Sequence, residues 1–319
     1  MKTTVKTIFM GTPELASIGL KTLLESDFFD ISLVVSQEDK SVGRGLKIIE
    51  TPVKQVAKEF NKETVQPKKI KEITERIKNE KPDLIVVIAY GKIIPKEILE
   101  IPTYGCINVH GSLLPKYRGS SCIQATILNG DEEGGITIMK MDEKMDTGDM
   151  IKRISTKIDE DETSKSLMEK IKVLTKENLV EVLKDYIDNK LEIEKQNEEE
   201  ASYVKMINKE DGVLRFNEEA AINIERKVRA YFPWPGTYAY IKDLQKKQIL
   251  FKLLKLSKEA IEDKDHNPGE LFLKDNKLFV KCKDRAIEIK TLQLEGKKAM
   301  DANEFLKGNS WILEEGLFV

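Results

Sequence analysis

The sequence predicts an α/β protein, with a doubly wound domain of alternating strands and helices followed by a smaller domain of short strands. The chain has 319 residues, which is enough for two domains. Over its first 160 residues, short apolar runs alternate with segments of helical periodicity, as in a parallel sheet covered by helices. Beyond residue 205, short alternating segments separated by polar turns favour a small β-barrel or sandwich.

Strands of the first domain are expected where a short apolar run precedes a turn. Residues 83–90 read DLIVVIAY, an apolar run typical of a parallel strand that helices cover on both faces. Residues 105–110, GCINVH, supply another strand and lead into a loop rich in glycine and proline. Further strands are expected at residues 5–10, 31–36, 64–67, 134–143 and 149–158.

Helices of this domain are predicted from periodicity and from the residues at their ends. Segment 68–81 carries three isoleucines at i, i+3 and i+7, which is the spacing of one helix face. A helix is expected to open at Thr51-Pro52, because proline suits the first helical turn. Other helices are expected up to Leu24, at residues 122–130, where a glycine ends the helix, and at residues 163–186. Residues 37–50 are expected to form a polar loop.

The second half of the chain differs in texture. Residues 189–204 are charged and weakly periodic, as is typical of a linker. A helix is then expected at residues 218–230, followed by the rigid turn FPWPG and several short strands. We therefore predict a first domain at residues 1–188, a linker at 189–204 and a second domain at 205–319.

Composition limits the classes of function. No window approaches the roughly 18 apolar residues of a membrane span, and the first residues lack the pattern of a signal or transit peptide. Three scattered cysteines do not form a disulfide framework, and two distant histidines argue against structural zinc. We therefore expect a cytoplasmic protein that does not act on a membrane. The net charge of −2 does not indicate nucleic acid, although the residues from Lys205 onward carry a net +3.

One strand end has the residue types of a catalytic site. Within CINVHGSLLPKYRG (residues 106–119), Asn108 and His110 are two residues apart, so in a strand both side chains lie on one face. An amide can donate to an oxyanion, and an imidazole can carry a proton near neutral pH. Asp146, in the turn MDTGDM, is the best candidate for a carboxylate partner. Spacing alone leaves the alternative open that His110 is a packed histidine and that the aspartate belongs to an ordinary turn.

Several blocks of the sequence resemble one enzyme family. NVHGSLLPKYRG is similar to the signature of enzymes that transfer a formyl group from 10-formyltetrahydrofolate, and MDTGDM, IFMGTPELA and AYGKIIP resemble three further blocks. The resemblance spans most of residues 4 to 160 and implies a Rossmann-like catalytic domain. It implies that Asn108, His110 and Asp146 form the catalytic triad. It also implies a folate-binding loop and a pterin pocket that include Ser112, Leu113, Leu114, Pro115, Ile88, Tyr90 and Gly91.

The chemistry that the resemblance implies needs no metal, because the formyl group is already activated on folate. An amine attacks the formyl carbon, a tetrahedral oxyanion forms, and the folate N10 leaves. Asn108 and a protonated His110 would stabilise that oxyanion. Asp146 would hold His110 and help to accept the proton that the amine loses.

The acceptor is predicted from other parts of the chain. The loop SQEDKSVGRGLKIIETPVK resembles an insertion that embraces an acceptor stem, with Arg44, Lys40 and Lys47 at phosphates. The block around FPWPG and the strand rhythm after it are similar to the OB-like barrel of family members that formylate methionyl-initiator tRNA. Phosphate contacts there would come from local clusters such as Lys246-Lys247, Lys281, Lys283-Arg285 and Lys297-Lys298. Two alternatives stay open: a small-molecule amine such as glycinamide ribonucleotide or an amino-sugar nucleotide, and a non-catalytic RNA-binding protein. The resemblance also implies a monomer.

Overall fold

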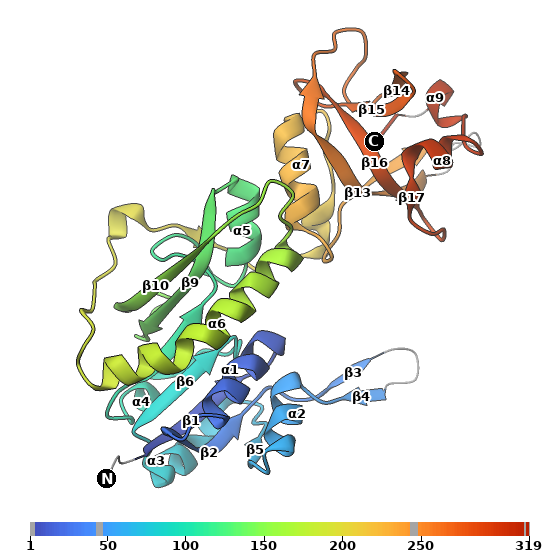
Figure 1. The fold of residues 1–319 in the computed structure, drawn as a ribbon. Coiled ribbons are helices and arrows are strands. Elements are labelled where there is room, and N and C mark those ends of the chain that lie inside the picture. Colours follow the sequence, from blue (N-terminus) through green and yellow to red (C-terminus); the bar gives the residue numbers. More distant parts are fainter. Residues whose placement is uncertain (1–3, 43–46, 243–247, 316, 319) are drawn as a thin grey trace. The chain divides into compact units, whose positions relative to one another are not determined.

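In the computed structural model, the chain forms two compact units, whose elements are labelled in Figure 1. The structure describes residues 4–42, 47–242, 248–315 and 317–318. The first unit comprises residues 1–122, 133–157 and 168–204. The second unit comprises residues 123–132, 158–167 and 205–319.

A seven-stranded sheet forms the centre of the first unit, in the order β10-β9-β7-β6-β1-β2-β5. The first five strands in sequence run parallel to their neighbours, whereas β9 is antiparallel to β7 and β10 is antiparallel to β9. The strands are β1 (Val5–Gly11), β2 (Phe29–Val35), β5 (Thr64–Val65), β6 (Leu84–Ile88), β7 (Cys106–His110), β9 (Glu133–Lys140) and β10 (Met150–Lys157). The predicted doubly wound α/β fold is thus confirmed.

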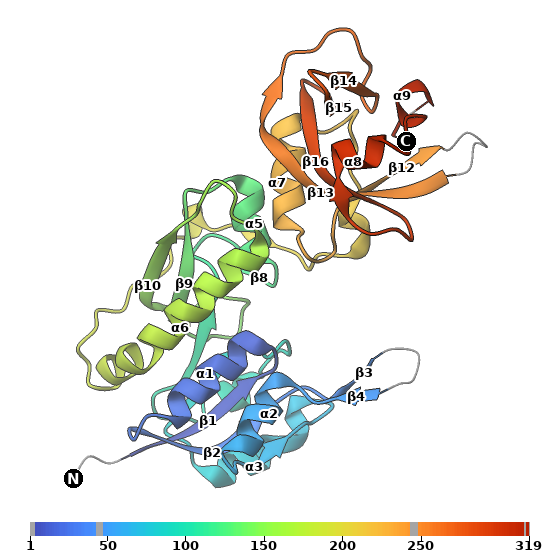
Figure 2. The same ribbon diagram turned by 45° about the vertical axis from the view of Figure 1, so that its right-hand side comes forward.

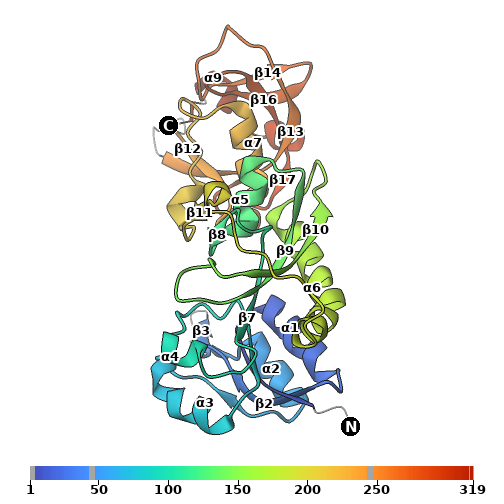
Figure 3. The same ribbon diagram turned by 90° about the vertical axis from the view of Figure 1, so that its left-hand side faces the viewer.

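Helices cover both faces of this sheet. Figure 3 views the sheet from one side, with α3 (Thr74–Glu80) and α4 (Lys96–Leu99) to its left, and α1 (Glu14–Leu24) and α6 (Ser164–Ile187) to its right. Every residue of β6 is buried, because helices exclude water from both of its faces. Where α1 passes over β6, Gly19 allows a close approach, since a Cβ there would lie 2.3 Å from the terminal methyl group of Ile88 and would require that side chain to move.

Two local predictions are corrected by the structure. The single helix predicted at residues 68–81 is divided into a 3₁₀ turn, η1 (Ile70–Ile73), and α3. The loop predicted at residues 37–50 contains a hairpin of β3 (Lys40–Val42) and β4 (Lys47–Ile49), whose pairing no local pattern announces. The helix predicted at Thr51-Pro52 is confirmed as α2 (Pro52–Glu59), and the Thr51 hydroxyl caps it by accepting from the Lys54 N–H.

An antiparallel sheet forms the centre of the second unit, in the order β12-β13-β16-β15-β14, with β17 paired to β16 (Figure 2). The strands are β12 (Tyr238–Lys242), β13 (Gln248–Ile261), β14 (Leu271–Lys274), β15 (Lys277–Lys281), β16 (Ala286–Leu294) and β17 (Met300–Asp301). Phe318 bridges to Ile241 on β12, and Leu317 bridges to Glu270 just before β14. These bridges connect the two ends of the sheet, as expected for the predicted OB-like barrel.

Helix α7 (Ala221–Ala230) supplies apolar side chains to the barrel core. Two further short helices, α8 (Ala302–Leu306) and α9 (Ile312–Glu315), follow β17. Helix α5 (Cys122–Asn129) begins at Cys122, which belongs to the first unit, and its other residues belong to the second unit. Among the helices that the structure describes, none is long and apolar enough to cross a membrane.

Candidate active site

The candidate site lies where the parallel strands end. In open α/β sheets, ligands bind beyond the carboxyl ends of the strands, near the point where the strand order reverses. Here the order reverses between β1 and β6, and β7 lies next to β6. His110 is the last residue of β7, so the strand delivers it to this edge of the sheet.

The structure brings the three residues of the predicted triad into one region. Asn108 pairs with Met139 on β9, and His110 pairs with Thr137, so both side chains lie on the same face of the sheet. His110 is buried, and its Nε2 lies 3.0 Å from the carbonyl oxygen of Tyr117. Its Nδ1 lies 3.7 Å from Oδ2 of Asp146.

Asp146 is held in place by the loop after β7. Its Oδ2 accepts a hydrogen bond of 2.8 Å from the Gly119 N–H. Its backbone has a φ of 54°, a left-handed conformation that costs a non-glycine residue roughly 1 kcal/mol or more and therefore needs support from its surroundings. This contact joins two residues that are 27 positions apart in the chain.

The surroundings of His110 favour its charged form. Burial by itself lowers the pKa of the imidazole, but the neighbouring Cys122 side chain, the Asp146 carboxylate and the Tyr117 carbonyl together raise it to about 9. Because the two ring nitrogens face acceptors on opposite sides, both carry a proton in the charged form. At neutral pH the site therefore contains an imidazolium beside a half-buried amide.

The loop after β7 is held by Thr137 on β9. The Thr137 hydroxyl donates to the Ser112 carbonyl at 2.7 Å and accepts from the Leu114 N–H at 3.0 Å. The Ser112 hydroxyl donates to the Lys116 carbonyl at 2.6 Å, which closes the turn. Leu114 and Pro115 are buried, and Leu113 is half-exposed. Of the predicted folate-loop side chains, Leu113 is therefore the most open to a ligand.

The segment after β6 offers mainly its backbone and one isoleucine. The side chains of Ile88 and Tyr90 are fully buried, and burial raises the pKa of Tyr90 to about 12. Gly91 is exposed, and a Cβ there would lie 2.5 Å from the Gln37 amide nitrogen, which donates to the Tyr90 carbonyl. Ile93 is 83% exposed. An apolar ligand at this edge would meet Ile93 and the backbone at Gly91.

The residues predicted to bind phosphate differ in whether the structure describes them and in whether their side chains are exposed. Arg44 and Lys246-Lys247 lie outside the described residues, and the structure describes the backbone of Lys47 in β4 but not its side chain. Lys40, at the start of β3, is exposed. In the second unit, Lys281 is buried and donates to the Asp263 and Asp284 carbonyls, so it supports the barrel and is not available to a phosphate.

Several residues near the site carry no signal in the local sequence pattern. Cys122 contacts His110 from the first residue of α5. Arg118 and Gln196, which are 78 residues apart, form a hydrogen bond of 2.9 Å beside the Asp146 turn.

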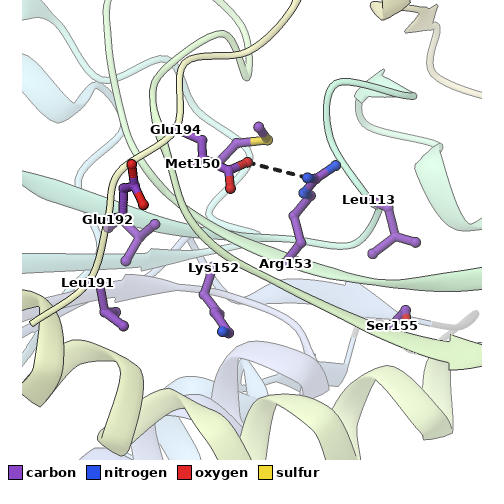
Figure 4. A pocket seen from close by; sticks show the side chains of 9 residues that line it. Leu113, Met150, Lys152, Arg153, Ser155, Leu191, Glu192 and Glu194 are labelled. Carbon is purple, nitrogen blue, oxygen red and sulfur yellow. Dashed lines mark hydrogen bonds and ion pairs between the residues drawn. The ribbon is translucent and has the colours of Figure 1, made fainter.

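A hollow of about 500 Å³ lies on the same sheet face, next to the site. Leu113 and residues 191–194 border it, together with Arg153 and Ser155 of β10, which pair with Thr137 and Gly135 of β9. Figure 4 shows the Arg153 guanidinium bonded across the hollow to Glu194, at 3.3 Å. Within the described part of the chain, no three His, Cys, Asp or Glu side chains group as metal ligands.

Comparisons with known proteins identify the family of the chain. The family described as "Formyl transferase" matches residues 5–183, and "Formyl transferase, C-terminal domain" matches residues 206–310. A methionyl-tRNA formyltransferase of Caldanaerobacter subterraneus subsp. tengcongensis is 41% identical, over 96% of this chain and 97% of that protein. One of Agathobacter rectalis is 39% identical, over 98% and 99%.

A solved structure shares the fold across both units. The N-formyltransferase from Helicobacter canadensis, in complex with folinic acid and dTDP-3-aminofucose, superposes with a TM-score of 0.64. It is 21% identical and covers 90% of this chain and 99% of its own. The family matches and the full-length relatives together lead to one conclusion: the chain belongs to the formyl transferase family, and within it to the methionyl-tRNA formyltransferases.

Proposed function

We propose that this protein transfers the formyl group of 10-formyltetrahydrofolate to the free amino group of methionyl-initiator tRNA, for the initiation of translation. The observation that carries this proposal is the similarity to methionyl-tRNA formyltransferases at about 40% identity over both units, barrel included. The protein would act in the cytoplasm, where initiation takes place, and as a monomer.

The reaction exchanges one carbon–nitrogen bond for another. The neutral α-amine of the methionyl ester attacks the formyl carbon, and the carbonyl oxygen becomes an oxyanion. The bond to N10 of the folate then breaks, and the proton that the amine loses replaces the formyl group on N10. The barrier lies in the developing oxyanion and in the proton transfer.

Asn108 and His110 are placed to lower that barrier. No described residue hydrogen-bonds to the Asn108 side chain, so its amide is free to donate to the oxyanion. The imidazolium of His110 supplies positive charge in a buried setting, where electrostatic stabilisation is stronger than in water. Donors of this type typically contribute a factor of about 10² to 10³ in rate.

Asp146 is placed to keep His110 charged and to receive a proton. Its carboxylate lies on the Nδ1 side of the ring and raises the pKa of His110. A carboxylate next to an imidazolium forms a short relay for the proton that leaves the amine. Gly91 and Ile93 at the adjoining strand end are the exposed groups that would contact the folate.

The acceptor assay tests the proposal directly. The purified protein is incubated with 10-formyltetrahydrofolate and, separately, with methionyl-initiator tRNA, glycinamide ribonucleotide and an amino-sugar nucleotide. Formylation of the tRNA-bound methionine is expected, whereas transfer to a small amine alone would refute the assigned acceptor. The His110→Ala variant should lose at least about 10² in rate, because the site loses its buried positive charge. Equal rates for this variant and the unaltered protein would rule out the assigned role of His110.

A further inference from the structure

The predicted linker contains a segment that packs against the active-site loop. Residues 196–204, which we call the brace, include η2 (Glu198–Glu200) and β11 (Tyr203–Val204). Strand β11 pairs in parallel with β8 (Arg118–Gly119), and Figure 3 shows the two strands side by side. The main-chain contact is close: a Cβ on Gly119 would lie 2.2 Å from the Val204 carbonyl oxygen. Only glycine fits at this position.

The brace reaches the backbone that holds His110. The Ser202 hydroxyl accepts a hydrogen bond of 2.9 Å from the Tyr117 N–H, and the Ser202 carbonyl accepts one of 2.8 Å from the Arg118 N–H. Tyr117 is the residue whose carbonyl oxygen contacts His110 Nε2. One hydrogen bond to the imidazole thus depends on a peptide group that the brace anchors.

Arg118 joins the brace to the loop through its side chain. The guanidinium is 0% exposed and binds both carboxylate oxygens of Glu198, at 2.8 and 3.0 Å. It also donates a hydrogen bond of 2.7 Å to the Tyr203 hydroxyl. A buried arginine without partners is costly, whereas a bidentate carboxylate gives it a fixed geometry. Arg118 therefore keeps the brace on the loop.

Gln196 makes the contact that reaches the other catalytic side chain. Of the nine residues from Glu192 to Glu200, it alone is half-buried, and the others are exposed. Its Nε2 donates to the carbonyl oxygens of Asp146 and Gly148, both at 2.8 Å, and its Oε1 accepts from Arg118 Nε at 2.9 Å. All three bonds hold the left-handed Asp146 turn against the loop.

We infer that the brace is a positioning element for formyl transfer and that Gln196 is its principal residue, holding the Asp146 carboxylate beside His110. Gln196 touches no reacting atom, so its contribution acts through Asp146. The inference rests on the proposed function, since it assigns a role within that reaction. Loss of the Gln196 hydrogen bonds to the Asp146 turn should slow the chemical step and leave substrate binding largely unchanged.

The decisive variant is Gln196→Glu. Glutamate retains an oxygen that accepts from Arg118, but it places a second oxygen against the Asp146 and Gly148 carbonyls. Both hydrogen bonds to these carbonyls are therefore lost. Lys195→Gln is the matched control, because it lowers the net charge by the same unit one residue away, at an exposed side chain outside the brace. The second variant is Gln196→Ala, which removes the side-chain hydrogen bonds of Gln196 without adding charge.

We expect kcat of Gln196→Glu to fall about 10- to 100-fold, with KM for methionyl-tRNA and for 10-formyltetrahydrofolate within about twofold of the unaltered protein. The kcat of Gln196→Ala should also fall, and the kcat of Lys195→Gln should stay within about twofold of the unaltered protein. A kcat within twofold for both Gln196 variants would overturn the inference. An equal loss of kcat in the Lys195→Gln control would overturn it as well.

A second readout does not depend on the acceptor. The chain has only two histidines, so NMR can follow the titration of His110 with His266 as an internal reference. The groups that face His110 are Cys122 on α5, Asp146 and the Tyr117 carbonyl. In Gln196→Glu, the Asp146 carboxylate should move away and the pKa of His110 should fall by at least half a unit. An unchanged His110 titration would contradict positioning, whereas absence of methionyl-tRNA formylation by the unaltered protein would contradict only the proposed function.

Discussion

His110 and Asp146 approach each other to 3.7 Å between Nδ1 and Oδ2, a distance that suits an ion pair more than a direct hydrogen bond. His110 is buried and Asp146 is half-buried, so solvent screens the attraction between their charges less than it would at the surface. Cys122 and the Tyr117 carbonyl add to the same effect. The imidazole is therefore held in its charged form at neutral pH, which is the form that can stabilise an oxyanion.

The raised pKa of His110 predicts how stability changes with pH. Between the ordinary value of 6.5 and about 9, the folded chain binds a proton at His110 that the unfolded chain has released. The free energy of unfolding should therefore fall as pH rises from about 6.5 to 9, by up to about 3 kcal/mol. Urea denaturation across this range measures the fall.

Two histidine variants control this measurement. His110→Gln should reduce the fall, since the proton-binding group is gone, whereas His266→Gln should keep it. A fall of the same size in His110→Gln would show that another group causes it. Stability is a cleaner readout than activity here, because the α-amino group of the acceptor titrates in the same range.

Ile93 allows a separate test of the folate segment. Its side chain is 83% exposed in the loop that follows β6, so it is free to pack against an apolar part of a ligand. Ile93→Ser should raise KM for 10-formyltetrahydrofolate about three- to tenfold, through loss of apolar contact of roughly 1 kcal/mol. Leu273→Ser, an exposed leucine of β14, is the control and should leave that KM unchanged. An unaltered KM for Ile93→Ser would remove this residue from the folate site.

A few side chains determine where a helix of this fold begins. Helix α2 begins at Pro52 because the ring fixes φ and the Thr51 hydroxyl replaces a missing intrahelical partner. That hydroxyl also lies 2.8 Å from the buried Ser36 hydroxyl at the end of β2. One threonine thus caps the helix and attaches it to the sheet.

Substitution of this cap gives a prediction at the scale of the element. Thr51→Ala should reduce the free energy of unfolding by about 2 kcal/mol, because α2 loses its cap and the buried Ser36 hydroxyl loses its partner. Thr51→Ser keeps the oxygen and should stay within about 0.5 kcal/mol of the unaltered protein. Chemical denaturation measures both, and an equal loss in the two variants would indicate that the methyl group, not the cap, matters.

Charge on the second unit bears on how the whole molecule engages a tRNA. The residues from Lys205 onward carry a net charge of only +3, so binding depends on local clusters. Lys281 is bound to barrel carbonyls, and Arg285 pairs with Glu262 at 3.0 Å. Lys297 and Lys298 are exposed in the turn between β16 and β17, and they directly follow Gly296, which lines a hollow together with Lys252 and Tyr238.

Reversal of these two charges should weaken binding in a salt-dependent way. Lys297→Glu/Lys298→Glu should raise KM for methionyl-tRNA and reduce the slope of log affinity against log salt by about 1 to 2, with KM for folate unchanged. Lys274→Glu/Lys277→Glu, at the β14–β15 turn of the same barrel, is the matched reversal. Steady-state kinetics at several salt concentrations measure both, and equal slopes for the two variants would place the phosphate contact elsewhere.

Much of the fold and part of the site are readable from the sequence. Short apolar runs located β1, β2, β6 and β7, and β6 is apolar throughout because helices cover both of its faces. Strand alternation placed Asn108 beside His110. The hairpin of β3 and β4 and the antiparallel direction of β9 against β7 were not predicted, since both depend on which strands pair and not on local composition.

The sequence alone determined the α/β alternation, the barrel-like second half, and the motif CINVHGSLLPKYRG that identified the reaction class. Local patterns carry this information because periodicity and turn chemistry act over a few residues. Only the tertiary structure decided that Cys122 contacts His110, that Lys281 is buried, and that Gln196 joins the Asp146 turn to Arg118. Gln196 is 50 residues from Asp146 and 78 from Arg118, and contacts at such separations exist only after the sheet has brought distant segments together.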